Sequence, residues 1–433
     1  MGNIYQRKTT DTSPTPAVPD EVLVSLGEIA ESAREGLLAL AVGAGLQVMY
    51  AMMDADVTVL AGPKGKHLPG RAAVRHGSED GSVTLGGRRV AVRRPRVRAV
   101  DGSGEVAVPS YELFAGTEVL GRMAMERMLA GLSTRRYGHG LEPVGGQVEA
   151  QAAATSRSAV SRRFVTATEH ALATMMNADL STLDLVVLMV DGVHFAEHTC
   201  VVALGVGVDG TKHPLALVEG STENATLATD LLVGLRERGL DVTRPILAVL
   251  DGAKALSRAV RDVFDKPIIQ RCQQHKIRNV RDRLPDKLRT LVERRMREAY
   301  HAETALAAEA KLTALAAELD RTHPGAAASL REGLAETLTV LRLGVPPTLA
   351  RTLRSTNPIE SMISICRDHS SNVKRWRDGQ MALRWCAAGM VEAANQFRRV
   401  NGHLHLPKLR AALERHVQES VTPVRQNQTS NAA

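Results

Sequence analysis

The chain has 433 residues, too many for one compact core, so we expect about two to four domains. Its 44% hydrophobic and 24% charged residues are ordinary for a soluble globular protein. A net charge of +8 and a pI near 9.5 favour a polyanionic partner, of which nucleic acid is the commonest. Four irregularly spaced cysteines form no disulfide framework, which indicates a reducing, cytoplasmic setting.

The N-terminal region separates into a tail and a helical part. Residues 1–20 are polar, rich in Pro and Thr, and lack the apolar core of a signal peptide, so we expect a disordered tail. Apolar spacing in residues 21–60 predicts helix, including the 18 uncharged residues from Gly36 to Met53. That stretch is at the lower limit for a membrane span, and it contains Gln47 and Tyr50. We therefore predict a packing helix and candidate dimer contact, with no membrane association.

Residues 61–110 are expected to form a small basic β-hairpin. The run from Val83 to Arg98 is β-branched and punctuated by glycine, and six of its last eleven residues are arginine. Arginines this dense, with almost no acidic partners, favour contact with phosphate over a solvated charged strand. The predicted DNA-contact residues here are Arg88, Arg89, Arg93, Arg94, Arg96 and Arg98.

Residues 111–180 are expected to be a helical DNA-binding domain. Ser133 is a candidate cap for a helix through Arg135 and Arg136. After Gly145-Gly146, the sequence QVEAQAAATSRSAVSRRFV predicts two short helices separated by a turn. This pattern suits a helix-turn-helix DNA reader, although many helical hairpins also carry a few arginines. The predicted contact residues are Arg135, Arg136, Arg157, Arg162 and Arg163.

A different pattern begins near residue 181. Three apolar, β-rich runs (LDLVVLMVDGVHF, TCVVALGVGV and KHPLALVEG) precede alternating helix and strand up to PIIQRC. This order predicts a mixed sheet covered by helices in residues 181–275. Residues 276–345 are expected to be helical throughout, residues 346–415 mainly helical, and residues 416–433 a loose tail.

Two carboxylates are the first candidates for chemistry. Asp191 and Asp251 each end an apolar run and precede a glycine, which lets the backbone turn away. Two such carboxylates can hold divalent metals for phosphoryl transfer. Asp209-Gly210, by contrast, joins two strands as a hairpin turn. The lone G-x-G-x-x-G ending at Gly210 lies between strands, so we do not predict a dinucleotide site there.

Spacing alone does not choose a third carboxylate among Glu197, Glu219, Glu223 and Glu360. The motifs VDGVHF, AVLDGAKAL, RCQQHKIRNV and STNPIESMIS, in this order, resemble the Mutator-type family of bacterial insertion-sequence transposases. The resemblance covers roughly residues 110–415, with GLSTRRYGHGLEPVGG and NVKRWRDGQMALRW as supporting stretches.

The resemblance implies an α/β fold: a ribonuclease-H-like mixed-sheet catalytic domain interrupted by an all-helical insertion, after a mainly helical DNA-binding region. It also implies an Asp-Asp-Glu triad of Asp191, Asp251 and Glu360, which binds two Mg²⁺ (or Mn²⁺) ions. The 109-residue step from Asp251 to Glu360 is too long for a simple connection and fits the insertion.

The family's Cys-x-x-His motif is matched by Cys272 and His275. One pair supplies only two of the four ligands of a structural zinc site, and Cys366 with His369 would be needed to complete it. We favour instead a position for His275 near DNA or the active site.

The segment NVKRWRDGQMALRW interleaves basic residues with two tryptophans, as in a backbone groove with a stacking platform. The alternative is that the tryptophans belong to the core. We assign the charges to DNA and Trp385 to the core. The predicted DNA-contact residues are Lys374, Arg375, Trp376 and Arg377, with Arg384 as a further basic residue of the segment.

The resemblance implies a homo-oligomer, at least a dimer, that binds terminal inverted repeats and target DNA. It would cleave DNA ends by metal-dependent hydrolysis and join the 3′-hydroxyls by strand transfer. Two alternatives are a structure-specific ribonuclease-H-like nuclease that joins nothing, and a non-enzymatic DNA-binding regulator, which would leave the acidic triad unexplained.

Overall fold

The computed structural model describes residues 37, 42 and 45–421, except 67, 142–143, 145–148, 150–151, 154 and 221–224. The chain divides into two compact units, Met1–Ala124 with Thr134–Arg163, and Met125–Ser133 with Phe164–Ala433. Several predictions lie outside the described residues: the tail at residues 1–20, most of residues 21–44, Glu223, most of the first helix of the predicted helix-turn-helix, and residues 422–433 of the C-terminal tail. The prediction that the tail starts at residue 416 is wrong, because the last helix continues to Val421.

The first unit is built on a β-hairpin, as predicted. β1 (Ala73–Leu85) and β2 (Arg88–Ala99) are antiparallel, and β3 (Glu105–Val106) pairs with β2. A helix at residues 45–61 buries Met49, Met53 and Val57, one turn apart, in the core of this sheet. This confirms the packing helix for the described residues. In that part of the chain, no helix is both long and apolar enough to cross a membrane.

Three short elements follow the hairpin: α2 (Pro109–Ala115), α3 (Glu118–Leu129) and the 3-10 helix η1 (Tyr137–Gly140). The helix predicted to start at Ser133 is wrong, because residues 134–136 form a turn that leads into η1. Gly138 and Gly140 disfavour a continuing α-helix, and the burial of Tyr137 fixes the turn against the unit.

The second unit contains a five-stranded mixed sheet in the order β6-β5-β4-β7-β8. Its strands are β4 (Leu185–Phe195), β5 (His198–Gly207), β6 (Lys212–Gly220), β7 (Ile246–Leu250) and β8 (Pro267–Arg271). The first three along the chain form an antiparallel meander, whereas β7 lies parallel to β4 and β8 lies parallel to β7. The predicted mixed sheet is therefore confirmed.

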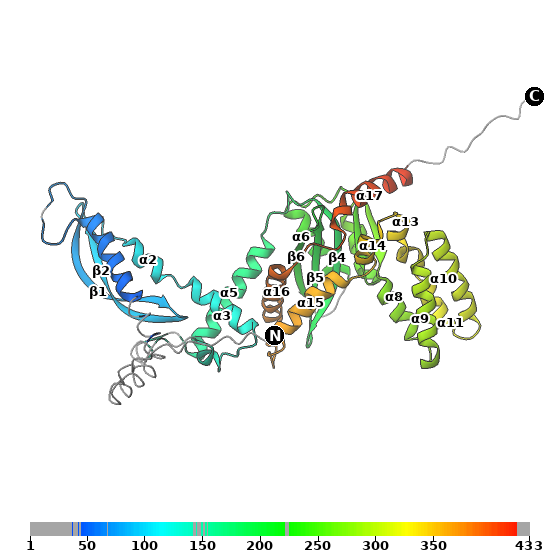
Figure 1. The fold of residues 1–433 in the computed structure, drawn as a ribbon, viewed down its shortest axis with the longest axis horizontal. Helices are drawn as coiled ribbons and strands as arrows, with labels where there is room; N and C mark the ends of the chain where they lie inside the picture. Colours follow the sequence, from blue (N-terminus) through cyan, green and yellow to red (C-terminus); the bar gives the residue numbers. More distant parts are fainter. Residues whose placement is uncertain are drawn as a thin grey trace, which may run out of the picture. The chain divides into compact units, whose positions relative to one another are not determined.

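Helices cover both faces of this sheet (Figure 1). α6 (Ala225–Glu237) and α7 (Lys254–Val263) share a core with one face. The other face packs against α14 (Pro347–Leu353), α15 (Asn357–Ser370), α16 (Gly379–Gln396) and α17 (Leu406–Val421). The end of α5 (Arg157–Met176) contributes Met175 to this second core, and η2 (His403–His405) precedes α17.

An all-helical segment separates β8 from α14. It comprises α8 (Gln273–Arg281), α9 (Asp286–Tyr300), α10 (Ala305–Asp320), α11 (Pro324–Arg331), α12 (Leu334–Thr337) and α13 (Thr339–Arg342). These helices share a hydrophobic core of their own and gather beside the sheet (Figure 1). The Gln273 N–H donates to the carbonyl oxygen of Arg354 at 2.9 Å, so the start of α8 lies beside the end of α14.

A buried lysine anchors this segment internally. Lys276 on α8 is completely buried, and its Nζ donates to the carbonyl oxygens of Ser329 and Glu332 at the end of α11. Burial lowers the pKa of Lys276 to about 8, so the side chain is mainly protonated at neutral pH. A cation at a helix C-terminus stabilises the carbonyls that have no partner within the helix.

We predict that Lys276→Met lowers the unfolding free energy by about 2–4 kcal/mol, because two buried carbonyls lose their donor. Thermal unfolding should show a fall in Tm of several degrees. Lys287→Ala, at an exposed position of α9, is the control and should leave Tm nearly unchanged. Equal Tm values for the two variants would contradict an anchoring role.

Candidate active site

Asp191 belongs to β4 and faces the sheet side that α15 covers. Val187, Met189 and Val193 of β4 pack into the core shared with α15, and side chains alternate along a strand, so Asp191 shares their face. The prediction that Asp191 ends its strand is wrong: β4 continues to Phe195, because its pairing with β5 extends to the turn. Asp191 is instead the first residue of β4 that is not fully buried.

Asp251 directly follows β7, as predicted. β4 and β7 are parallel, with Val187 opposite Leu247 and Met189 opposite Val249. Continuing this register by two residues places Asp251 opposite Asp191 on the same face. The next residue, Gly252, has a φ of +112°, and a Cβ there would lie 2.2 Å from Nε of Arg271. Glycine is thus required for the turn that follows Asp251.

Glu360 lies in the first turn of α15, opposite the two aspartates. Ile359, Met362 and Ile363 bury one side of this helix against the sheet, which leaves half-buried Glu360 at the rim. The pKa of Asp191 is raised to about 6, mainly by burial and in part by the charges of Asp251 and Glu360, against a lowering hydrogen bond from the Gly192 N–H. The three carboxylates therefore repel one another.

The site opens into a hollow of about 590 Å³. Its lining residues are Asp191, Gly192, His275, Arg278, Asn357, Glu360, Ser361, Ile363, Ser364 and Arg367. Arg278, Asn357, Ser361, Ser364 and Arg367 were not predicted. The positions on α15 recur three or four residues apart, so the helical spacing around Glu360 was the available signal for them.

His275 lies in this hollow, and its Nδ1 is 3.7 Å from Oε1 of Glu360. The hydroxyl of Thr356 lies within 3.4 Å of Cys272 Sγ and within 3.3 Å of His275 Nδ1. A hydrogen bond with Cys272 raises the pKa of His275 despite partial burial. Hydrogen bonds from His275 and Thr356 lower the pKa of Cys272, although burial, the largest single effect, opposes them.

The four-ligand zinc set does not assemble. Cys366 lies on the buried face of α15 and packs against Gly389 of α16. Nδ1 of His369 instead hydrogen-bonds the carbonyl oxygen of Leu129 at 2.8 Å. Neither residue lies in the cluster that Cys272 forms with His275.

The three carboxylates suit hard divalent cations. Carboxylate oxygens are the ligands that Mg²⁺ prefers, and bound cations would relieve their repulsion. Asp191, Asp251 and Glu360 are therefore the carboxylates of this site that could hold divalent cations.

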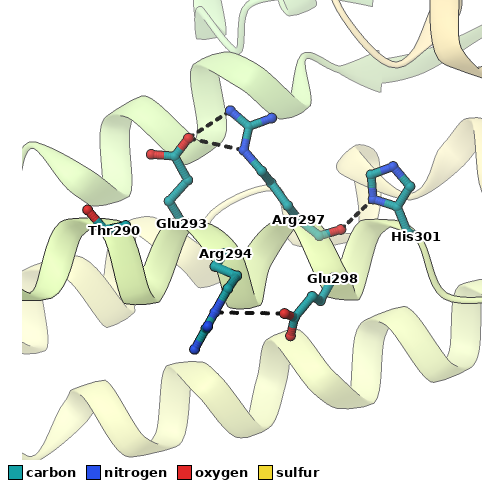
Figure 2. Close-up of a pocket in the computed structure, with 6 residues that line it drawn as sticks. All are labelled: Thr290, Glu293, Arg294, Arg297, Glu298 and His301. Carbon is teal, nitrogen blue, oxygen red and sulfur yellow. Dashed lines mark hydrogen bonds and ion pairs between the residues drawn. The ribbon is translucent and has the colours of Figure 1, made fainter.

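A second hollow, of about 420 Å³, lies along α9 and contains no such site (Figure 2). Its arginines are paired on the same helix, Arg297 with Glu293 at 2.7 Å and Arg294 with Glu298 at 3.8 Å. His301 hydrogen-bonds the carbonyl oxygen of Arg297. We assign no chemistry to this surface.

The sequence profile described as "Transposase, Mutator family" matches residues 29–400. The chain belongs to this family. It is 34% identical to the transposase for insertion sequence element IS6120 of Mycolicibacterium smegmatis over 229 residues. The aligned region covers 52% of this chain and 70% of the relative. It is 25% identical to the transposase for insertion sequence element ISRM5 of Rhizobium meliloti (strain 1021) over 374 residues, and this aligned region covers 84% of this chain and 90% of the relative. The transposase for IS256 in Tn4001 of Staphylococcus aureus is 24% identical over 342 residues, 76% of this chain and 83% of the relative.

Fewer arginines of the basic hairpin of this transposase are available to contact DNA than expected. The premise that its arginines lack acidic partners is wrong, because β1, β3 and Glu149 supply them. Arg88 pairs with Glu149, Arg93 with Asp80, Arg94 and Arg96 with both Glu79 and Glu105, while Arg89 donates to Ser82 and Thr84. Arg98 is exposed and takes part in none of these pairs.

The tryptophan segment is mainly part of the core. Trp385 is 4% exposed, as predicted, and half-buried Trp376 packs against Phe195 in a tilted arrangement with ring centroids 4.8 Å apart. This packing disfavours a stacking platform. Arg384 is buried and donates to Thr168, so its assignment to a basic groove is wrong. The exposed residues Lys374, Arg375 and Arg377 remain predicted DNA contacts.

The predicted end-reading residues differ in exposure. Arg157 and Arg162 are exposed on α5, whereas Arg163 is half-buried and burial lowers its pKa. Arg135 and Arg136 are exposed in the turn before η1. Their contact with DNA remains a prediction.

We predict that Arg98→Gln weakens binding to all DNA sequences alike and reduces the salt slope of the affinity by about 1, the value for one phosphate contact. Binding titrations over a range of salt concentrations, with two unrelated duplexes, measure both quantities. Arg94→Gln is the control, and it should change the slope less because Glu79 and Glu105 already bind this side chain. An effect of Arg98→Gln on only one duplex would indicate base reading instead.

Proposed function

We propose that this transposase cuts and joins DNA at a two-metal site held by Asp191, Asp251 and Glu360. The observation that carries the proposal is the placement of both strand carboxylates on the sheet face covered by α15, where Glu360 lies. The order of the sheet and the helical segment between β8 and α14 support a ribonuclease-H-like catalytic domain with an all-helical insertion.

In this proposal, each of the three carboxylates is held in position by its own element of the fold. The pairing of β4 with β5 and β7 fixes Asp191, the Gly252 turn aims Asp251, and α15 presents Glu360 across the hollow. When bound, two Mg²⁺ or Mn²⁺ ions would supply a strong nucleophile and stabilise the entering and leaving oxygens of an in-line displacement. The exposed side of α15, with Asn357 and Ser364, borders the space for the DNA strand.

The relatives are named as transposases of insertion sequence elements. We therefore infer that the DNA bound is the terminal repeats of such an element together with a target. Cleavage would leave a 3′-hydroxyl, which then attacks a second phosphodiester. Because two ends must be joined together, the active form is inferred to be at least a dimer. The exposed apolar side chains Val48, Met52 and Val59 on the helix at residues 45–61 are candidates for that contact.

A structure-specific nuclease is the second candidate, because it would use the same carboxylates. It would cut DNA and leave the 3′-hydroxyl unjoined. A strand-transfer assay with a pre-cleaved, labelled end and a supercoiled target separates the two functions.

Asp191→Asn, Asp251→Asn and Glu360→Gln should each reduce cleavage and joining by about a thousandfold or more. Several kcal/mol of charge stabilisation are lost, and each 1.36 kcal/mol is tenfold in rate. DNA binding should persist. Glu197→Gln, an exposed carboxylate in the turn after β4, is the matched control and should stay active. Near-normal Mg²⁺-dependent joining by Glu360→Gln would assign the third carboxylate elsewhere.

Arg157→Ala and Arg162→Ala test end recognition by α5. An arginine bonded to guanine in the major groove provides about 1–3 kcal/mol of discrimination. At least one variant should therefore narrow the affinity difference between an element end and a scrambled duplex by about tenfold or more. Arg236→Ala, at an exposed position of α6 that is not a predicted DNA contact, serves as the control. If neither exposed arginine changes that difference, another part of the chain reads the end.

A further inference from the structure

Cys272, His275 and Glu360 form a compact cluster of three different ligand types. One ligand atom from each residue lies within 4.8 Å of the other two. Cys272 and His275 stand at the start of α8, and Glu360 is in the first turn of α15. We propose that this cluster binds a divalent cation of zinc type, and that zinc bound here takes Glu360 from the carboxylate triad and so inhibits the enzyme. Only the inhibitory part rests on the proposed function.

The spacing is close to what zinc requires. Tetrahedral Zn²⁺ with bonds of about 2.0–2.3 Å sets its ligand atoms about 3.3–3.8 Å apart. The Nδ1 atom of His275 is already 3.7 Å from Oε1 of Glu360. The other pairs lie within 4.8 Å, so shifts of about 1 Å complete the set. Side-chain rotation suffices for such shifts.

The hydroxyl of Thr356 lies between the three ligand atoms. It is 3.4 Å from Cys272 Sγ, 3.3 Å from His275 Nδ1 and 2.5 Å from Glu360 Oε1. A hydroxyl has one proton, so it donates to only one of these atoms at a time. A cation that displaced this hydroxyl would contact all three ligand atoms at once.

The donor set selects zinc over magnesium. Thiolate and imidazole ligands suit Zn²⁺, whereas Mg²⁺ prefers oxygen. Cys272 is the N-cap residue of α8, and its side chain accepts no capping hydrogen bond. The positive end of the helix therefore favours the thiolate that zinc binds. His275 and Glu360 line the hollow, so water can fill the fourth position and zinc can enter from that side.

The binding test uses the full-length, tag-free chain, with Zn²⁺ as the only ligand titrated. Titration calorimetry in excess Mg²⁺ measures the affinity for zinc and the number of zinc ions bound. We expect one zinc per chain, and Co²⁺ in its place should give the strong near-ultraviolet absorption of cobalt–thiolate bonds. Cys272→Ser should weaken zinc binding by about a hundredfold or more and abolish that absorption. Cys366→Ala, outside the cluster, is the control and should retain both. Equal zinc affinity of Cys272→Ser and the wild type would overturn the proposal, as would the absence of saturable binding.

The inhibition test measures Mg²⁺-dependent DNA cleavage against zinc concentration, with each variant normalised to its own zinc-free rate. Zinc should inhibit the wild type at the concentration where calorimetry shows binding, and it should inhibit Cys272→Ser only at about hundredfold higher concentration. The same inhibition curve for both proteins would overturn the shared use of Glu360. If the wild type cleaves no DNA in any metal, the proposed function fails, while the calorimetry still decides whether zinc binds.

Discussion

The parallel pairing of β4 with β7 is the constraint on which the candidate site depends. The register sets residue 187 beside residue 247, and the same offset sets Asp191 beside Asp251. A slip of one residue would turn one aspartate to the face covered by α6 and α7, since side chains alternate along a strand. The buried residues before each aspartate, such as Val190 and Leu250, resist that slip because it would move their side chains from one packed core to the core on the opposite face.

Placing three carboxylates close together at the candidate site costs folding free energy, which the rest of the fold offsets. Asp191 is partly withdrawn from water and lies near two other carboxylates, which raises its pKa. Apolar packing on both sides of the sheet supplies the stability that permits this arrangement. Strained or repulsive groups that persist in this way are typical of sites where a ligand relieves the repulsion.

Local sequence patterns predicted the sheet, the helices and the two strand carboxylates, because these depend on periodicity and on residues close in the chain. Glu360 could not be chosen from spacing, since its position depends on how α15 returns to the sheet after the helical segment. The acidic partners of the basic hairpin were missed for the same reason. Glu79 and Glu105 lie far from Arg94 in sequence and meet it only through strand pairing. Likewise, nothing local indicates that Cys272 approaches Glu360 but not Cys366.

The hydrogen bond from Gln273 to Arg354 joins the first residue of α8 to the residue that follows α14. The two ends of this stretch of chain therefore meet beside the sheet, and the helical segment within it has its own hydrophobic core. Entropy of loop closure grows only slowly with length once the ends are held together. A change in the length of this segment that keeps both ends in place would therefore cost the fold little, and it would leave Asp251 and Glu360 at the same separation.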